Sequence, residues 1–258
     1  LAKVVRPDGE EVTFEYDALG RRLSKGFGTT VTRWMWNGNV PLHQWIQHRT
    51  YSWNDGNWEM EQEHSGRLLW LFDERSFVPV AMIKEGKAYS IMTDHLGTPT
   101  QAYDPEGNEV WSRMLDMDGN VLEETGNIGM IPFLFQGQYF DCEIGLAYNR
   151  FRYYSPQMGI YISQDPIRLE GGVTNIYAYV NDTNVWNDIF ALAGSGGAYM
   201  FGFESGEMYI GKGEINRMKK SIITRSKQVQ NPKLIGAAHV STHGNNELGK
   251  MVEYKAMR

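Results

Sequence analysis

The chain has 258 residues, 41% of them hydrophobic, which is enough for a substantial core in one or two domains. No run of about 18 apolar residues occurs, so the sequence predicts no membrane-spanning helix. A single cysteine, Cys142, excludes internal disulfides and zinc sites built on cysteine, and fits synthesis in a reducing compartment. The chain begins at Leu1 and shows no signal peptide, so we expect a piece of a longer protein.

The net charge of −6 is unevenly distributed. Residues 1–192 carry 15 Lys/Arg and 26 Asp/Glu, a net charge of −11, whereas residues 193–258 carry 10 and 5, a net charge of +5. This asymmetry predicts two units with different partners, of which the basic unit is the candidate for binding a polyanion. The alternative is one neutral fold with a basic tail.

Residues 1–192 consist of short alternating runs between turn signals. Runs at 12–16, 31–36 and 108–115 are rich in β-branched and aromatic residues, which is typical of strands. Proline presets a turn, and Gly or Asn accepts a positive φ. Hairpin loops are therefore predicted at PDG (7–9), NGN (37–39), NDG (54–56), DPEG (104–107) and DMDG (116–119). The two similar units at 7–23 and 105–122 predict a mainly antiparallel, extended sheet of stacked hairpins.

The segment EYDALGRR (15–22) resembles the tyrosine–aspartate repeat of Rhs (rearrangement hot spot) and teneurin-type proteins. The resemblance is dense from about residue 90 to 192, above all in FQGQYFDCEIGLAYNRFRYYSPQMGIYISQDPIRLEGG (135–172), and looser over 1–90. It implies a YD-repeat antiparallel sheet that forms part of a hollow β-shell around a variable C-terminal toxin. We accordingly expect an Rhs core segment at 1–192 and a toxin domain at 193–258.

The resemblance also implies self-cleavage. The family's shell ends in D-P-x-G-L and is cut after the leucine, which here aligns Asp188 with the aspartate and places the cut between Leu192 and Ala193. The implied chemistry is that of an aspartyl protease, in which two carboxylates share a proton, and Asp165 is the second candidate. Without the resemblance, Asp165 would be interpreted as a turn-forming Asp-Pro and Asp188 as a surface acid.

Three residues depart from the family pattern at this site. Thr183 and Ile189 stand at usual prolines, and Ala191 stands at the usual glycine. If that position needs a positive φ, a Cβ costs about 1 kcal/mol or more. We therefore expect this chain to stay uncleaved, with an intact mass of 29.5 kDa.

The last 66 residues predict a hairpin at 197–213, a helix at 214–222 with Ile215, Met218 and Ile222 on one face, and a second helix at 245–258. Gly197-Ala198-Tyr199 and Tyr209-Ile210-Gly211 resemble the two signature elements of GIY-YIG nucleases, with nine residues between the tyrosines. This second resemblance covers 197–258 and implies a small α+β nuclease domain.

Phosphodiester cleavage needs a deprotonated water and stabilisation of charge at the phosphate and the leaving oxygen. The resemblance assigns Mg²⁺ or another divalent cation to Glu253, with Glu247 as runner-up, and a catalytic role to Tyr199 and Tyr209. Arg217 is placed to clamp the scissile phosphate, with Lys219 as the alternative. Three further cations, Lys212, Lys220 and Arg225, are candidates for backbone phosphates. The histidine common in the family is replaced by Ser221, which leaves His239 or His243 as the general-base candidate.

The sequence thus predicts the C-terminal part of a secreted Rhs effector, a β-shell segment that holds and releases a metal-dependent nuclease for interbacterial competition, with DNA favoured over RNA. The resemblance implies synthesis in the bacterial cytoplasm, delivery into target cells by type VI secretion components such as a VgrG spike, and a cognate immunity protein. Exposed sheet edges also favour a homodimer.

Two alternatives remain at this stage. In the first, the basic tail is a non-catalytic module that binds nucleic acid or protein. In the second, the chain is a carbohydrate-binding surface protein whose platform consists of tryptophans. The candidates for that platform are Trp34, Trp36, Trp53 and Trp58, although core packing is the commoner role of such residues.

Overall fold

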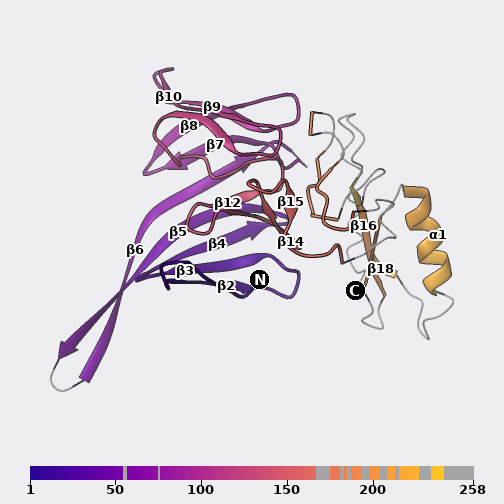
Figure 1. Cartoon of the computed structure of the whole chain (residues 1–258), viewed down its shortest axis with the longest axis horizontal. Coiled ribbons are helices and arrows are strands. Elements are labelled where there is room, and N and C mark those ends of the chain that lie inside the picture. Colours follow the sequence, from indigo (N-terminus) through magenta and orange to yellow (C-terminus); the bar gives the residue numbers. More distant parts are fainter. Residues whose placement is uncertain are drawn as a thin grey trace. The chain divides into compact units, whose positions relative to one another are not determined.

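A computed structural model describes residues 1–54, 57–74, 76–166, 175–180, 183–184, 187–192, 198–203, 208–212, 215–226 and 234–240. The chain forms two compact units, Leu1–Arg150 and Phe151–Arg258. Figure 1 colours them along the sequence from indigo to yellow. The boundary expected at 192/193 therefore lies inside the second unit and stays a prediction. Among the described helices, none is long and apolar enough to cross a membrane.

The first unit is built on an eleven-stranded sheet in which the order of strands in space is their order in the sequence. Its strands are β1 (Lys3–Val5), β2 (Glu11–Tyr16), β3 (Arg22–Phe27), β4 (Thr30–Asn37), β5 (Val40–Asn54), β6 (Asn57–Phe72), β7 (Pro79–Lys84), β8 (Lys87–Thr93), β9 (Pro99–Tyr103), β10 (Glu109–Leu115) and β11 (Val121–Gly126). Neighbouring strands pair antiparallel throughout. The predicted mainly antiparallel β fold is confirmed.

Most of the hairpin loops lie where the turn residues predicted them. The turns at 7–9, 38–39, 104–107 and 116–119 each connect two paired strands. Residues 55–56 of the NDG loop lie outside the described residues, but Asn54 pairs with Asn57 across it. Figure 1 shows β5 and β6 continuing beyond the neighbouring strands as a two-stranded ribbon.

The Asp-x-x-Gly motif explains why these loops recur. In the loop that follows β2, an Asp17 carboxylate oxygen accepts hydrogen bonds from the backbone N–H groups of Leu19 and Arg21, at 2.9 and 2.8 Å. Gly20 then takes a φ of +75°, which a glycine adopts without steric cost. The loops beginning at Asp94 and Asp116 repeat this arrangement. A short local motif therefore fixes each hairpin, independently of distant contacts.

The core of the first unit lies between the later strands and the segment that follows β11. It consists of Trp70, Met82, Ile91, Ala102, Trp111, Ile131 and Phe133. The Arg113 guanidinium donates to the carbonyl oxygens of Ile131 and Phe133, which holds this segment against the sheet. Trp34 is also buried, at 4% exposure, so it is unsuited to an exposed carbohydrate platform. Trp36 is half-buried, and the side chains of Trp53 and Trp58 lie outside the described set.

A buried ionic cluster joins β3 to the next hairpin, formed by β12 (Tyr139–Asp141) and β13 (Leu146–Asn149). Arg22 contacts one Asp141 oxygen at 2.5 Å, and Lys25 contacts the other at 3.0 Å and Glu143 at 2.8 Å. The Arg22 guanidinium also lies 4.4 to 5.6 Å from the ring centroids of Phe14, Trp34, Tyr139 and Tyr148. Ion pairing and cation–π contacts thus compensate for the burial of the Arg22 charge, whose side chain is 1% exposed.

The second unit begins with a short hairpin of β14 (Arg152–Ser155) and β15 (Ile160–Tyr161). Farther along, β16 (Ala198–Phe203), β17 (Met208–Lys212) and β18 (Leu234–Val240) form a sheet in the order β17-β16-β18. Helix α1 (Ile215–Ser226) lies between β17 and β18 in the chain, and its Ile222 packs on Phe201 and Phe203.

The predicted hairpin at 197–213 is confirmed by the pairing of β16 with β17. The helix predicted at 214–222 is also confirmed and extends four residues farther, to Ser226. Strand β18 is an element that the sequence reading did not predict. The second predicted helix, at 245–258, lies outside the described residues.

Candidate functional site

Arg152 organises the candidate site of the second unit. It lies in β14, all four of whose residues are buried, and it is itself 2% exposed. A buried guanidinium needs partners for its donors, because an unpaired charge in the protein interior is costly. The structure supplies them from segments well separated along the chain.

Two aspartates converge on one nitrogen of this guanidinium. Arg152 Nη2 lies 3.2 Å from Asp165 Oδ2 and 3.3 Å from Asp188 Oδ2. Asp165 is 3% exposed and Asp188 is fully buried. The interpretation of Asp188 as a surface acid is therefore wrong. The two residues chosen by resemblance lie close together, since both contact the same atom.

Asp188 is also bound by groups other than Arg152. The Tyr161 hydroxyl donates to Oδ2 at 3.0 Å, and the backbone N–H of Leu192 donates to Oδ1 at 2.8 Å. The backbone N–H of Asp188 donates in turn to the Tyr179 hydroxyl at 3.3 Å. These bonds fix the Asp188 carboxylate against the backbone of the predicted cleavage segment.

The same arginine holds the backbone just before the predicted cut. Arg152 Nε donates to the Ala191 carbonyl oxygen at 2.6 Å, and Nη1 donates to the Ile176 carbonyl oxygen at 3.2 Å. Ala191 is fully buried and has a φ of +54°. The left-handed backbone that the sequence analysis considered for this position is the one observed, and an alanine there carries the corresponding strain of about 1–2 kcal/mol.

Three tyrosine rings pack around the site. Tyr154, Tyr161 and Tyr179 have ring centroids 5.0 to 5.8 Å apart, and the Arg152 guanidinium lies 3.7 Å from the Tyr161 ring centroid. Burial, followed by the charge of Asp188, raises the pKa of Tyr161 and of Tyr179 well above 10.0. Both hydroxyls therefore stay protonated at neutral pH, and the Tyr161 hydroxyl can donate to Asp188.

Two buried carboxylates therefore lie beside a backbone amide. Leu192 is bound directly to one of them, and Ala193, on the far side of the predicted cut, lies outside the described residues. Sequence reasoning missed Arg152 and Tyr161, although an arginine inside the aromatic run FRYYS was a signal that a buried carboxylate lies nearby.

The structure places four of the predicted nuclease residues on the small sheet. Tyr199 of β16 is the register partner of His239 on β18, and Tyr209 of β17 is the register partner of Phe201. Lys212 of β17 is the register partner of Ala198.

Tyr209 is half-buried in the core of this sheet. Its ring stacks on Phe201 with centroids 5.3 Å apart and an interplanar angle of 24°, and it meets Phe203 edge-on at 5.9 Å. The Arg225 guanidinium of α1 lies 5.2 Å from the Tyr209 ring centroid. A packing role for this tyrosine is therefore established.

The remaining candidates are only partly placed. Arg217, Lys219, Lys220 and Ser221 lie on α1. Glu247, Glu253 and His243 lie outside the described residues. Within the described part of the chain, no group of three or more His, Cys, Asp or Glu side chains is arranged to hold a metal ion.

Comparison with known proteins identifies the class of protein that this sheet represents. Residues 1–186 match the Teneurin YD-shell family, and the chain belongs to that family. A crystal structure of TcdB2-TccC3-TEV has a similar fold, with a TM-score of 0.51 and 20% sequence identity over 74% of this chain and 10% of that chain.

Two curated relatives are named as toxins or nucleases. The chain is 32% identical over 206 residues to the probable deoxyribonuclease RhsA of Dickeya dadantii (strain 3937), a match covering 75% of this chain and 13% of that protein. It is 31% identical over 209 residues to the double-stranded DNA deaminase toxin A of Burkholderia cenocepacia (strain H111), covering 72% and 14%. The chain thus spans about an eighth to a seventh of the length of these relatives, which support an Rhs-type polymorphic-toxin shell.

Proposed function

We propose that this chain is the C-terminal part of a secreted Rhs effector, whose shell segment holds a small metal-dependent nuclease and is built to release it by cleavage after Leu192. The observation that carries this proposal is the convergence of two buried carboxylates, Asp165 and Asp188, on Arg152 beside the backbone of residues 191–192. Membership in the YD-shell family supports it, as do relatives named as DNA-acting toxins.

In the release step, Asp165 and Asp188 share one proton. The ionised carboxylate takes a proton from a water molecule, which attacks the Leu192 carbonyl carbon, and the protonated carboxyl donates its proton to the leaving nitrogen of Ala193. Arg152 holds both carboxylates and the preceding carbonyl oxygen in place. In the chain as it stands, the Cβ of Ala191 works against the required backbone conformation, and we expect the bond to remain intact.

The nuclease assignment rests on the basic charge of residues 193–258 and on the order of elements. Tyr199 and Tyr209 lie on adjacent strands, the helix carrying Arg217 follows, and His239 lies opposite Tyr199. Glu253 is the proposed ligand of Mg²⁺ or another divalent cation, which would stabilise charge on the phosphate and the leaving oxygen. Glu253 lies outside the described residues.

Further proposals follow from the nuclease assignment. Nucleic acid is the substrate, with DNA favoured over RNA. A type VI spike such as VgrG carries the effector to target cells, and a cognate immunity protein covers the basic site in the producing cell. The names of the relatives favour a toxin role of this kind.

One observation favours a second function, in which the tail binds nucleic acid or protein without cleaving it. Tyr209 already has a packing role against Phe201, Phe203 and Arg225, so its position in the sequence does not require catalysis. The basic charge suits either function.

The deciding experiment incubates the whole chain and its Ala191→Gly variant with plasmid DNA and with total RNA, each with Mg²⁺ and with a chelator. Glu253→Ala is the test substitution and Glu247→Ala the matched control. We expect metal-dependent degradation of DNA that Glu253→Ala abolishes, with DNA binding retained. If both nucleic acids survive under every condition while DNA is bound, the tail is a binding module.

A further inference from the structure

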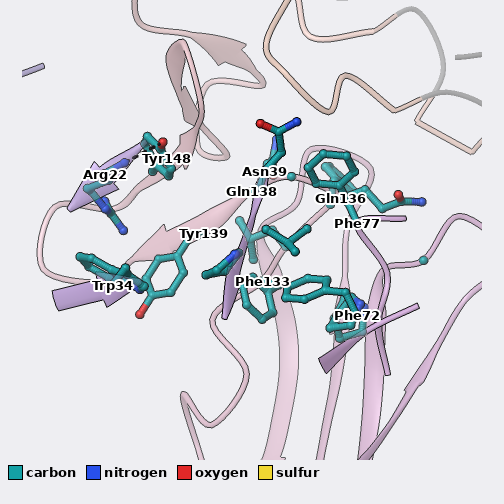
Figure 2. Close-up of a pocket in the computed structure, with 18 of the residues that line it drawn as sticks. Arg22, Trp34, Asn39, Phe72, Phe77, Phe133, Gln136, Gln138, Tyr139 and Tyr148 are labelled. Atoms are coloured by element: carbon teal, nitrogen blue, oxygen red, sulfur yellow. Dashed lines mark hydrogen bonds between the residues drawn. The ribbon is translucent and has the colours of Figure 1, made fainter. Parts of the chain in front are cut away.

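A cavity in the first unit takes no part in the proposed function. Its volume is about 500 Å³ when the open solvent at its mouth is counted, and its lining residues lie between Arg22 and Tyr148 in the sequence. Its walls come from β3 to β7, β9, β13 and the segment 133–139. Figure 2 shows the rings of Trp34, Tyr139, Phe133 and Phe72 in a row along it.

The lining is apolar and poor in hydrogen-bond donors. Besides the aromatic rings, three prolines contribute to it, Pro41, Pro79 and Pro99, and proline has no backbone N–H. Among the described lining residues, Arg22 alone carries a charge, and its guanidinium is ion-paired with Asp141 at 2.5 Å. An occupant suited to these walls is uncharged and largely apolar.

One polar side chain in this lining stands out. Gln138 is 1% exposed, and within the described chain neither its Nε2 nor its Oε1 has a hydrogen-bond partner. An unsatisfied buried polar group costs about 1–3 kcal/mol. Gln136, two residues earlier in the same wall, is different, because its Nε2 donates to the Leu96 carbonyl oxygen. The side chain of Gln136 therefore contributes a hydrogen bond to the fold, whereas that of Gln138 contributes none within the described chain.

We propose that the cavity is a binding site for an extended, uncharged peptide segment that inserts an aromatic side chain and pairs its adjoining backbone amide with Gln138. A carboxamide offers a donor and an acceptor side by side, which is the complement of a peptide N–H and C=O. The aromatic walls favour a ring, through offset and edge-to-face contacts. Gln138 is one of the residues that line the cavity.

A nucleobase is the strongest competing occupant, since glutamine can also pair with the edge of adenine. The charge of the site disfavours a nucleotide. A phosphate would meet Arg22 already paired with Asp141, beside Lys25 already paired with Asp141 and Glu143. A peptide brings no such charge, so the peptide fits the walls better.

The test uses the whole chain with N-acetyl-L-phenylalaninamide as the probe, followed by NMR of the glutamine side-chain NH₂ groups. N-acetylglycinamide, toluene and adenosine are the comparison ligands. Gln138→Met removes the amide at nearly constant volume, and Gln136→Met is the matched control. Urea unfolding of each variant measures stability independently of binding.

We expect the phenylalaninamide to shift the Gln138 NH₂ signals and to bind at least tenfold more weakly to Gln138→Met. Gln138→Met should be at least as stable as the parent chain, whereas Gln136→Met should be less stable. Absence of binding would overturn the proposal, as would equal affinity for the parent and Gln138→Met. A loss of stability in Gln138→Met matching that in Gln136→Met would overturn it too, since it would give Gln138 a structural role. Tighter binding of adenosine or toluene than of the amide would assign the cavity to a different occupant.

Discussion

Two buried arginines, one in each unit, have similar surroundings but different arrangements of charge. Arg22 and Arg152 are each at most 2% exposed, and each lies over aromatic rings. At Arg22, the carboxylate of Asp141 lies between two cations, so opposite charges alternate. At Arg152, one nitrogen draws two carboxylates together. The first arrangement places a carboxylate between two cations, and the second places a cation between two carboxylates.

The largest expected loss of stability is in the buried cluster of Arg22, Lys25, Asp141 and Glu143. Asp141→Asn leaves Arg22 and Lys25 buried without their shared carboxylate, and breaking a buried ion pair in this way costs about 3–5 kcal/mol. Urea unfolding followed by tryptophan fluorescence measures it, because seven of the eight tryptophans lie in this unit. Glu143→Gln, whose side chain is 21% exposed, is the control and should cost much less.

Loss of Arg152 should leave Asp165 and Asp188 to repel each other, an effect that the cluster around Arg22 cannot show. Arg152→Met leaves Asp165 and Asp188 close together without the guanidinium, and we expect a loss of about 3–5 kcal/mol. Adding Asp188→Asn to Arg152→Met should restore part of that loss, although Asp188→Asn alone destabilises. The stability of this site is measured by hydrogen exchange at the Leu192 amide, which donates a hydrogen bond to Asp188. Additive effects of the two substitutions would show that repulsion between the carboxylates is negligible.

The site around Arg152 should also differ from the cluster around Arg22 at high pH, because it contains the buried hydroxyl of Tyr161. Tyr161→Phe removes a hydrogen bond to a charged group, worth about 1.5–3 kcal/mol. Because burial and Asp188 raise the pKa of Tyr161, the folded chain holds this proton more tightly than the unfolded chain does. Stability is therefore present below pH 10.0 and is lost as the pH rises above it. We expect alkaline unfolding of residues 151–192 to move to higher pH in Tyr161→Phe, as followed by hydrogen exchange, and an unchanged midpoint would contradict this account.

A smaller effect is expected at Ala191. Glycine accepts a φ of +54° without the Cβ penalty, so Ala191→Gly should stabilise the second unit by about 1 kcal/mol. Ala198→Gly is the matched control, since Ala198 lies in a regular strand, where glycine is unfavourable. If Ala191→Gly is instead less stable than the parent chain, the positive φ is not a source of strain at this position.

The smallest effect is at the exposed hairpin loops. The side chain and then the backbone N–H of Asn108 bind the Asp104 carboxylate and lower its pKa below 3.8. The stabilisation is therefore present above pH 3.8 and is lost as the pH falls below it. Asp104→Asn should reduce the acid sensitivity of this hairpin, as measured by amide exchange, whereas Glu106→Gln in the same loop should leave it unchanged.

The hairpins could be predicted because their causes are local. Asp17 and Gly20 fix a loop within a few residues, and alternation fixes the strands on either side. Strand β18 was missed because Gly236, Ala237 and Ala238 lack the β-branched and aromatic character that marks a strand. Its place is set by pairing with β16, which is a tertiary effect.

The candidate site was predictable only in part, for the same reason. Asp165 and Asp188 were found through resemblance, since nothing in their immediate sequence separates them from a turn residue and a surface acid. Tyr161 would be read as a core aromatic, and the partner of its hydroxyl lies 27 residues later in the chain. The positive φ of Ala191 was foreseeable only because the aligned residue in the family is glycine.

The most direct test of the account is the intact mass of the purified Ala191→Gly chain beside the parent. We predict that the parent stays at 29.5 kDa and that Ala191→Gly separates into residues 1–192 and 193–258, with cleavage abolished by adding Asp165→Asn or Asp188→Asn. An Ala191→Gly chain that stays intact, or cleavage that survives loss of either carboxylate, would contradict the assignment of this site to self-cleavage.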